Sequence, residues 1–279
     1  MGNMIKVSIC VPVFNNESYL LPFLDSVLRQ SLEDIEVIFA DNHSTDRSYE
    51  ILRNYATVFP NKVFVYQTAK HGGPGMGRNL AFQKSHGEYI YWCDSDDIIH
   101  PNALEELYKE AKKYNADIVC ASGVRVDEEN GEITSVANIT QKQTMAVSNE
   151  VAIVSSEIQF WSQLFKRELV ELVGLMPNAV ILDDVRYVTV LRTYAKTIRF
   201  LDFPVYYWFM RKSSTTNAIR KELCQDLVDA DAYMLQHCNP KHLQAVQFLA
   251  GIRERWNMDF RWPLLDIYIN WLRENAAWI

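Results

Sequence analysis

Apolar, β-prone runs alternate with segments of helical period throughout the first 125 residues, and no other feature restricts the fold of this chain so strongly. Strand, helix and strand in repeated succession build a mostly parallel sheet with helices packed on its faces. The sequence therefore predicts the α/β class. We expect strands near residues 6–13, 35–41, 62–68, 89–93 and 117–122, and helices near 18–30, 46–58, 75–85 and 101–114.

An acidic cluster stands at the end of the strand expected at 89–93, where Asp94, Asp96 and Asp97 follow the last apolar residues. The carboxyl ends of parallel strands are where open α/β proteins bind their ligands. Three neighbouring carboxylates repel one another unless a cation lies among them, and hard oxygen ligands suit Mg²⁺ or Mn²⁺. The cluster favours a metal-bound phosphate site. The simpler alternative is an N-terminal cap for the helix that begins near Pro101.

Polar side chains also follow the first two expected strands. Asp41 ends the second strand, and Ser44 or Asp46 can cap the helix after it, so Asp41 is not needed for capping. We expect the Asp41 carboxylate to accept a ring N–H from a uracil-like base. In the first strand, Pro12 has no N–H to donate, so we expect it to mark the point where that strand leaves the sheet.

A glycine-rich segment, residues 70–79, connects the third and fourth expected strands. Its glycines let the main chain approach a ligand closely, while Lys70 and Arg78 can meet phosphate oxygens. The spacing is neither the dinucleotide-binding fingerprint nor the phosphate-loop motif, which disfavours an NAD enzyme and a P-loop ATPase. A surface turn before a helix is the structural alternative.

Four motifs, in this order and spacing, resemble those of the family-2 glycosyltransferases with a GT-A fold, which build bacterial capsules, lipopolysaccharides and other cell-surface glycans. They are residues 11–15, 41–46, 77–79 and 94–97. The resemblance extends over residues 1–215, because residues 181–187 are similar to the family's Glu-Asp motif and residues 211–214 to its basic closing loop.

The resemblance implies roles for individual side chains. Asp41 would read the nucleobase, and Asp184 would be the catalytic base. Asp94 and Asp96 would serve the ribose and a Mn²⁺ or Mg²⁺ ion. The further donor-binding residues that it implies are Pro12, Val13, Phe14, Asn15, Glu17, Lys70, Gly75, Arg78, Asn79, Ser95, Arg211 and Ser213.

The chain departs from the family's usual motifs at two points. Asn42 and His43 stand where the family usually carries Asp and Gly, which bears on the identity of the base. Asp183 stands where the family usually carries the Glu of its Glu-Asp pair.

The residue types suit displacement of a nucleoside diphosphate from an anomeric carbon. A divalent ion and nearby Lys or Arg side chains stabilise the charge that builds up on the departing phosphate, so no protein acid is required there. The acceptor hydroxyl needs a base, and a single carboxylate on the opposite face of the sugar gives inversion. We expect Asp184 to be this base. The alternative is that Asp183 or Asp184 only caps the start of a helix.

We expect the chain to divide into a GT-A domain at 1–215, the extent of the resemblance, and a helical extension at 216–279. Within the domain we expect a nucleotide-sugar half at 1–125 and an acceptor half at 126–215. The second half opens at 126–150 with a polar hairpin turn and then a mobile loop, which we expect to form a lid over the acceptor. The helices expected in the extension lie near 219–237, 240–257 and 263–277.

The expected partners are a UDP-sugar donor and a glycan or lipid-linked glycan acceptor. A formal net charge of −7 over 279 residues disfavours nucleic acid as a partner. The apolar runs are shorter than the roughly 18 residues that a membrane span requires, and the start of the chain does not resemble a signal peptide. Five cysteines without paired spacing fit a reducing compartment, so we expect a cytoplasmic enzyme.

The last expected helix, 263–277, places Leu264, Tyr268, Trp271 and Leu272 on one face. An aromatic stripe of this kind is typical of a packed core or of a homodimer interface. Peripheral contact with the inner face of a membrane is the alternative, which the absence of a basic excess disfavours.

Two other functions fit parts of the pattern. A sugar nucleotidyltransferase also places metal-binding acids on an α/β sheet, yet it needs a glycine-rich loop with Lys or Arg directly after the first strand, where this chain has Asn15, Asn16 and Glu17. A catalytically silent protein that binds a sugar nucleotide or a carbohydrate has no need to combine metal-binding acids with a base.

Overall fold

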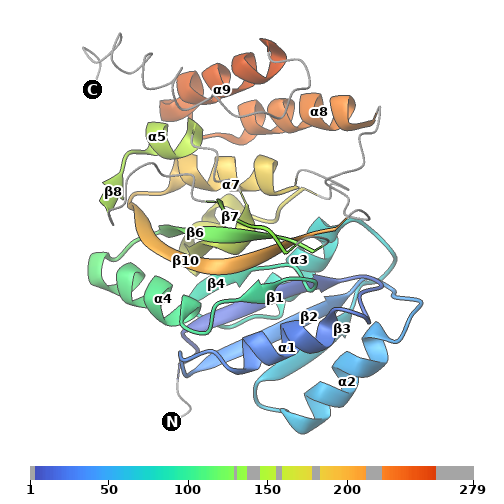
Figure 1. Cartoon of the computed structure of the whole chain (residues 1–279). Helices are drawn as coiled ribbons and strands as arrows, with labels where there is room; N and C mark the ends of the chain where they lie inside the picture. The colour runs from blue at the N-terminus through green and yellow to red at the C-terminus, as the bar shows by residue number, and fades with distance from the viewer. Residues whose placement is uncertain are drawn as a thin grey trace.

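The computed structural model describes residues 4–128, 131–136, 145–154, 159–177, 183–211 and 222–255, and Figure 1 shows their arrangement. A mixed sheet of ten strands forms the centre of this described part. The strands follow one another across the sheet in the order β3-β2-β1-β4-β9-β6-β10-β5, while β7 pairs with β6 and β8 pairs with β10. The predicted α/β class is confirmed.

The strands are β1 (Val7–Val13), β2 (Ile35–Asp41), β3 (Val63–Gln67), β4 (Tyr89–Trp92), β5 (Ile98–Ile99), β6 (Ile118–Asp127), β7 (Ile133–Val136), β8 (Met145–Val147), β9 (Gln163–Lys166) and β10 (Ile198–Met210). The α-helices are α1 (Leu20–Leu28), α2 (Ser48–Val58), α3 (Pro74–Gln83), α4 (Ala103–Tyr114), α5 (Asn149–Val154), α6 (Arg167–Val173), α7 (Asp183–Tyr194), α8 (Glu222–His237) and α9 (Leu243–Arg255). Short 3₁₀ helices span Phe160–Ser162 and Pro240–His242.

Strands far apart in the sequence end at one edge of the sheet. β1 pairs in parallel with β2 and β4, and β2 pairs in parallel with β3. β9 runs antiparallel to both β4 and β6, so β4 and β6 point the same way, and β10 lies parallel to β6. The carboxyl ends of β1, β2, β3, β4, β6 and β10 therefore share one edge, which we call the carboxyl rim.

The elements predicted in the first 125 residues agree with the structure except at their ends. The largest difference is β6, which continues to Asp127 instead of ending near residue 122. The proposed boundary between residues 125 and 126 therefore falls inside a strand, and the two predicted halves share one sheet. The predicted hairpin turn is confirmed, because β6 and β7 pair antiparallel around Gly131, whose φ is 69°.

The segment after this hairpin was expected to be a loop as far as residue 150. That prediction is wrong for its last part, where β8 pairs with β10 and α5 begins at Asn149. Residues 137–144, the rest of the expected lid, lie outside the described residues. The antiparallel strand β9 and the long strand β10 were not predicted.

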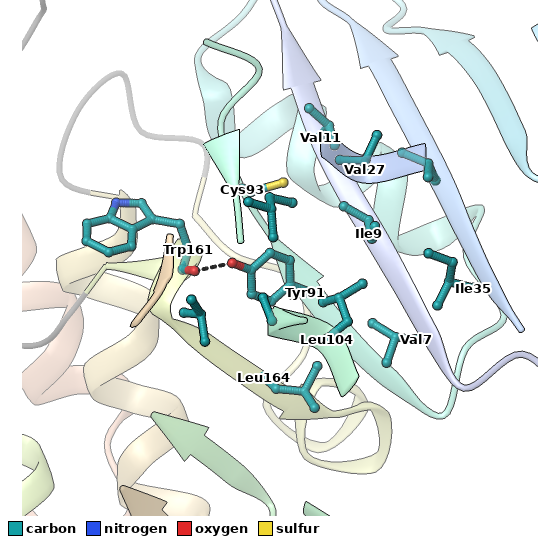
Figure 2. Close-up of a cluster of buried hydrophobic side chains, with 14 of the residues drawn as sticks. Val7, Ile9, Val11, Val27, Ile35, Tyr91, Cys93, Leu104, Trp161 and Leu164 are labelled. Carbon is teal, nitrogen blue, oxygen red and sulfur yellow. Dashed lines mark hydrogen bonds between the residues drawn. The ribbon is translucent and has the colours of Figure 1, made fainter. Parts of the chain in front are cut away.

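Apolar clusters cover both faces of the sheet. On one face, β1 packs against Leu24 of α1, Leu52 of α2 and Leu104 of α4, and Figure 2 shows part of this cluster. On the other face, α3, α6 and α7 pack around Trp92. Cys10, Cys93 and Cys120 are buried within these clusters, as small apolar residues would be.

Helix α3 approaches the sheet closely at Gly77. A Cβ atom at Gly77 would lie 2.9 Å from Cβ of Pro12, so only glycine fits there without a shift of the main chain. We expected the first strand to leave the sheet at Pro12, and this prediction is wrong. Strand β1 stays paired with β2 as far as Val13. Its pairing with β4, in contrast, ends at Cys10. The missing N–H of Pro12 is tolerated because β4 no longer pairs with β1 at that level.

Helices α8 and α9 pack on α7 and α5, on the side away from the sheet (Figure 1). Ile153, Val190, Met234 and Val246 lie in the apolar cluster that joins these helices. The first two predicted helices of the extension are confirmed. The predicted homodimer face at 263–277 lies outside the described residues. No helix in the described part of the chain combines the length and the apolar composition that a membrane span requires.

Candidate active site

A turn of acidic residues, 94–97, leaves β4 at the carboxyl rim, and we call it the acid turn. Asp97 is buried, and its carboxylate accepts hydrogen bonds from the N–H of Phe209 (2.9 Å) and the hydroxyl of Tyr206 (3.0 Å). Burial and the other two carboxylates of the turn raise the pKa of Asp97 well above its ordinary value. Asp97 therefore anchors the acid turn to β10.

Arg78 of α3 connects the acid turn to the start of α7. Its side chain is 7% exposed, and it donates hydrogen bonds to Asp183 and, over 2.6 Å, to Asp94. The guanidinium carbon also lies 4.9 Å from the centroid of the Phe160 ring. Burial alone lowers the pKa of Arg78, but Asp183 and Asp94 outweigh burial, and the pKa is raised. Arg78 thus remains charged and holds together two segments that are distant in the sequence.

Asp184 lies next to this ion pair, in the first turn of α7. Burial, followed by the charge of Asp183, raises the pKa of Asp184 to about 7. Its Oδ1 accepts the N–H of Val185 over 2.8 Å, as expected of an acid at a helix start. A carboxylate with a pKa near neutrality is suited to remove a proton from a hydroxyl group at neutral pH. Asp183 is less suited, because Arg78 occupies its carboxylate.

Arg211, directly after β10, contacts Asp96, a partly exposed acid of the turn. Its guanidinium pairs with Asp96 over 3.0 Å and with Glu128 over 3.2 Å, and it lies 4.0 Å from the centroid of the Tyr19 ring. Burial and the neighbouring Asp94 raise the pKa of Asp96 to about 6, against the opposing effect of Arg211. The predicted basic closing segment therefore begins at the rim, beside the predicted metal ligand. Its other predicted residue, Ser213, lies outside the described residues.

The acid turn offers two carboxylates for a divalent ion, those of Asp94 and Asp96, whose side chains are 39% and 36% exposed. Within the described residues, no group of three or more His, Cys, Asp and Glu side chains is placed to hold a metal ion. Magnesium, however, is commonly bound through one or two carboxylates together with substrate phosphates and water. The residues present therefore fit an ion that binds together with a diphosphate.

Asp41, at the rim end of β2, has no exposed surface. Its Oδ2 accepts hydrogen bonds from the amide of Gln67 over 3.0 Å and from the N–H of Ser44 over 3.2 Å. Gln67 lies at the adjoining end of β3 and is exposed. Since the carboxylate has no exposed surface in this conformation, a nucleobase reaches it only after side chains around it move. The base-reading role of Asp41 stays a prediction.

Asn42 fixes the glycine-rich segment and was not foreseen as a site residue. Its amide donates to the C=O of Gly72 and accepts both the N–H of Gly72 and the hydroxyl of Thr68, each over 3.0 Å. Nδ1 of His71 lies 3.0 Å from the main-chain oxygen of Asn42. The Asn that stands here in place of the family's Asp could have signalled this bidentate contact, because an amide both donates and accepts, whereas an ionised carboxylate only accepts.

The glycine-rich segment brings an aromatic pair to the rim. The ring of His71 lies 4.4 Å from the ring of Phe14, centroid to centroid, and Phe14 is 43% exposed. Lys70 is exposed nearby in sequence, whereas Gly75 is buried in the first turn of α3. Phe14 and His71 therefore present an aromatic surface at the rim ends of β1 and β3.

The loops after β1 and β2 are joined by their own side chains. Oδ1 of Asn15 accepts the N–H of Thr45 over 2.7 Å, and Oε2 of Glu17 accepts the N–H of Arg47 over 2.8 Å. Val13 contributes its main-chain oxygen, which accepts the N–H of Asn42. Most residues predicted after the first strand thus hold the rim loops in place.

Asn79 and Ser95 also have protein partners. The amide of Asn79 donates to the C=O of Met176 over 2.9 Å and accepts its N–H over 3.0 Å. The hydroxyl of Ser95, within the acid turn, accepts the amide of Asn16 over 2.6 Å. Both residues therefore position main chain around the site, and a direct contact with a donor stays a prediction.

In a comparison with protein families, the model described as Glycosyl transferase family 2 matches residues 8–173. Among curated proteins, a poly(ribitol-phosphate) beta-glucosyltransferase of Bacillus spizizenii is 34% identical over 172 residues, which are 60% of this chain and 26% of that protein. A cholesterol galactosyltransferase of Borreliella burgdorferi is 26% identical over 227 residues, which are 77% of this chain and 63% of that protein. Two Streptococcus pneumoniae glycosyltransferases, GlyG and GlyA, are matched over 41% and 33% of their lengths.

Among solved structures, residues 1–349 of Staphylococcus aureus TarS in complex with UDP superpose on this chain with a TM-score of 0.73 at 21% identity. The superposition covers 92% of this chain and 73% of that chain. The same TarS fragment in complex with UDP-GlcNAc gives a TM-score of 0.73 at 22% identity. At this level of identity the likeness establishes the fold, and it agrees with the order of strands described above.

Proposed function

Because the chain belongs to glycosyl transferase family 2, we propose that it transfers a sugar from a nucleotide-sugar to a hydroxyl group, with inversion at the anomeric carbon. The observation that carries this proposal is the pair of contacts made by Arg78. These contacts bring the acid turn and the start of α7 together at one place on the rim. The acid turn is suited to bind the diphosphate through an ion, and the start of α7 holds a carboxylate suited to act as a base.

We assign the donor to the UDP-sugars. The related fold of TarS has been solved with UDP and with UDP-GlcNAc. At the rim of this chain, the rings of Phe14 and His71 and the carboxylate of Asp41 are the groups that we assign to the nucleobase. A carboxylate acceptor suits the N3–H of uracil and opposes the unprotonated N3 of cytosine. Calorimetric titration should give tighter binding of UDP than of GDP or CDP, and equal affinity for all three would remove Asp41 from base recognition.

The base in the proposed reaction is Asp184. It takes the proton of the acceptor hydroxyl as that oxygen bonds to the anomeric carbon, while the bond from this carbon to the diphosphate breaks. With one base and no second carboxylate acting as a nucleophile, the product has the inverted configuration, β from an α-linked UDP-sugar. Arg78 keeps Asp183 and Asp94 in place, and its fixed charge favours the ionised form of Asp184.

The proposed cofactor is Mn²⁺ or Mg²⁺, held by Asp96 and Asp94 together with the oxygens of the diphosphate. When bound, the ion supplies positive charge that stabilises the departing diphosphate. Arg211 and Lys70 are the basic side chains that we assign to the same phosphates. Arg211 is already held at Asp96, which supports this assignment.

The acceptor that we propose is a hydroxyl group of a glycan or a lipid-linked glycan, in the synthesis of a surface polysaccharide. The relatives named above act, by their names, on poly(ribitol-phosphate) and on cholesterol, so the family relationship alone supports a hydroxyl acceptor and not one particular molecule. The match covers 26% of the length of the poly(ribitol-phosphate) enzyme, so the acceptor of this chain is to be identified by a direct test.

The test is to incubate the purified protein with a panel of UDP- and GDP-sugars, with Mn²⁺, Mg²⁺ or EDTA. We expect slow hydrolysis of one UDP-sugar that depends on the ion, together with a raised unfolding temperature in the presence of UDP and the ion. With an acceptor identified from the panel, an NMR spectrum of the product should show the inverted anomeric centre. Retained configuration would contradict the single-displacement mechanism.

A further inference from the structure

The hydroxyl of Tyr206 lies in the interior beneath the acid turn and joins that turn to β10. Tyr206 is fully buried. The N–H of Asp94 donates to its hydroxyl oxygen over 3.2 Å, and the hydroxyl in turn donates to Oδ2 of Asp97 over 3.0 Å. The other carboxylate oxygen of Asp97 accepts the N–H of Phe209, which returns the connection to β10. One buried hydroxyl thus contacts both ends of the acid turn.

The ring of Tyr206 is itself held rigidly. Trp161 stacks on it with a centroid distance of 4.7 Å and an angle of 12° between the ring planes. The indole fits there because residue 123 is glycine: a Cβ atom at Gly123 would lie 2.4 Å from the Trp161 ring. The main-chain oxygen of Trp161 accepts the hydroxyl of Tyr91, as Figure 2 shows, and Tyr91 is the second-last residue of β4, the strand from which the acid turn departs. The hydroxyl of Tyr206 therefore has little freedom to follow a displaced turn.

We propose that Tyr206 is a positioning residue for the divalent ion and the diphosphate. Its hydroxyl fixes the main chain of Asp94, and thereby the direction of the carboxylates that we assign to the ion. The inference rests on the glycosyl transfer proposed above. Three acids in four residues repel one another, so the geometry of the turn needs a support that is independent of the ion. Residues that orient metal ligands from behind typically contribute 10- to 100-fold to metal affinity.

A purely structural role for Tyr206 is the competing explanation, and the two roles differ in what they change. If the hydroxyl only stabilised the fold, its loss would lower the unfolding temperature and leave the need for the ion unchanged. If the hydroxyl positions the acid turn, its loss specifically weakens the binding of the ion. The reason is that the N–H of Asp94 then lacks its buried partner and the turn can shift.

The experiment uses the variant Tyr206→Phe, which keeps the ring stacked on Trp161 and removes only the hydroxyl. Binding of labelled UDP is measured by equilibrium dialysis over a range of Mn²⁺ concentrations, and in EDTA. The matched control is Tyr207→Phe, because Tyr207 is the next residue of the same strand and its ring stacks on His100 instead. Unfolding temperatures of all three proteins are recorded in parallel.

We expect the Mn²⁺ concentration for half-maximal UDP binding to rise by about tenfold or more in Tyr206→Phe and to stay unchanged in Tyr207→Phe. The weak binding of UDP in EDTA should be equal in the three proteins. An unchanged Mn²⁺ requirement in Tyr206→Phe, with or without a lower unfolding temperature, overturns the proposal. If the unaltered protein itself shows no dependence of UDP binding on Mn²⁺, the proposed cofactor fails first and this inference fails with it, while the proposed glycosyl transfer is left to its own test.

Should Tyr206→Phe not fold, Asp97→Asn provides the second variant, since it keeps the size of the side chain and weakens the bond to the hydroxyl. A rise in the Mn²⁺ requirement in the same direction supports the proposal, and an unchanged requirement overturns it.

Discussion

The two ends of the carboxyl rim are built by different interactions. At the end formed by β1, β2 and β3, which we call the neutral end because its side chains bond mainly to uncharged groups, Asn15, Asn42 and Glu17 bond to main-chain groups of the next loop. At the end formed by β4, β10 and α7, charged side chains bond to one another: Arg78 to Asp94 and Asp183, and Arg211 to Asp96. The first end is a frame of hydrogen bonds, and the second is a set of buried or partly buried ion pairs.

The difference indicates how each end responds to a change. A hydrogen bond from a neutral side chain contributes about 1 kcal/mol, and neighbouring bonds of the same kind share the task. Removing one partner of a buried ion pair leaves an uncompensated charge, which typically costs about 3–5 kcal/mol. The charged end should therefore be sensitive to single substitutions and the neutral end tolerant of them.

The largest loss is expected for Asp96→Ala. We expect transfer to be abolished and ion-dependent binding of UDP to weaken strongly, because the main carboxylate for the ion is removed. The assays are product formation and calorimetric titration of UDP with Mn²⁺. Glu50→Ala on α2, an exposed acid, is the control and should behave as the unaltered protein. Near-normal turnover of Asp96→Ala would exclude Asp96 as a metal ligand.

Next in size is Asp184→Asn, which keeps the shape of the side chain and removes its basicity. We expect kcat to fall by roughly 100-fold or more, as is typical for the loss of a general base, while donor affinity changes little. Steady-state kinetics at saturating donor measures this. Asp25→Asn on the exposed surface of α1 serves as the control. An unimpaired kcat would refute the assignment.

Substitution of Arg78 tests the charged end by stability. Arg78→Met should lower the free energy of unfolding by about 3 kcal/mol or more, because Asp183 is left buried without its partner. Adding Asp183→Asn should recover a large part of this loss. Arg29→Met, which breaks an exposed i,i+4 pair with Asp25, should cost only a few tenths of a kcal/mol. Equal losses for Arg78→Met and Arg29→Met in urea unfolding would contradict the comparison between the two ends.

A pH profile tests the same end without mutation. The base acts in its ionised form, and a raised pKa means that this form is lost as the pH falls through about 7. We therefore expect kcat/KM to rise with pH and to level off above about 7. Below that pH, the slope of log kcat/KM against pH should correspond to the loss of one proton. The limb near pH 7 should be absent from the residual activity of Asp184→Asn. A profile that is flat down to pH 5 would contradict the raised pKa.

The smallest effect is expected at the neutral end. Asn42→Ala removes the bidentate contact with Gly72, so we expect UDP to bind about three- to tenfold more weakly with little change in kcat. Asn54→Ala on the exposed side of α2 is the control. A loss of kcat as large as that of Asp184→Asn would show that the two ends are not as different as the structure indicates.

Sequence and structure agree on local features and differ on contacts between distant elements. The strands and helices up to α4 were predicted because hydrophobic periodicity and turn residues are local signals. The acid turn, Asp41 and the glycine-rich segment were located for the same reason: each lies at the end of a strand or shortly after it. Three contacts were not predicted, because each joins residues from separate elements: the pairing of Arg78 with Asp183, the support of the acid turn by Tyr206, and the hydrogen bond from Gln67 to Asp41.

By itself, the sequence determined the parallel βαβ part of the fold, the positions of the strand ends and the family to which the chain belongs, since periodicity, spacing and motif order are all written along the chain. Only the tertiary structure decided which of these residues meet. Strand β9 runs antiparallel between β4 and β6, and this order alone brings β10, with Tyr206 and Arg211, to the same rim as the acid turn. Burial, which sets the pKa of Asp184 and the cost of breaking the Arg78 pairs, arises only when the elements pack against one another.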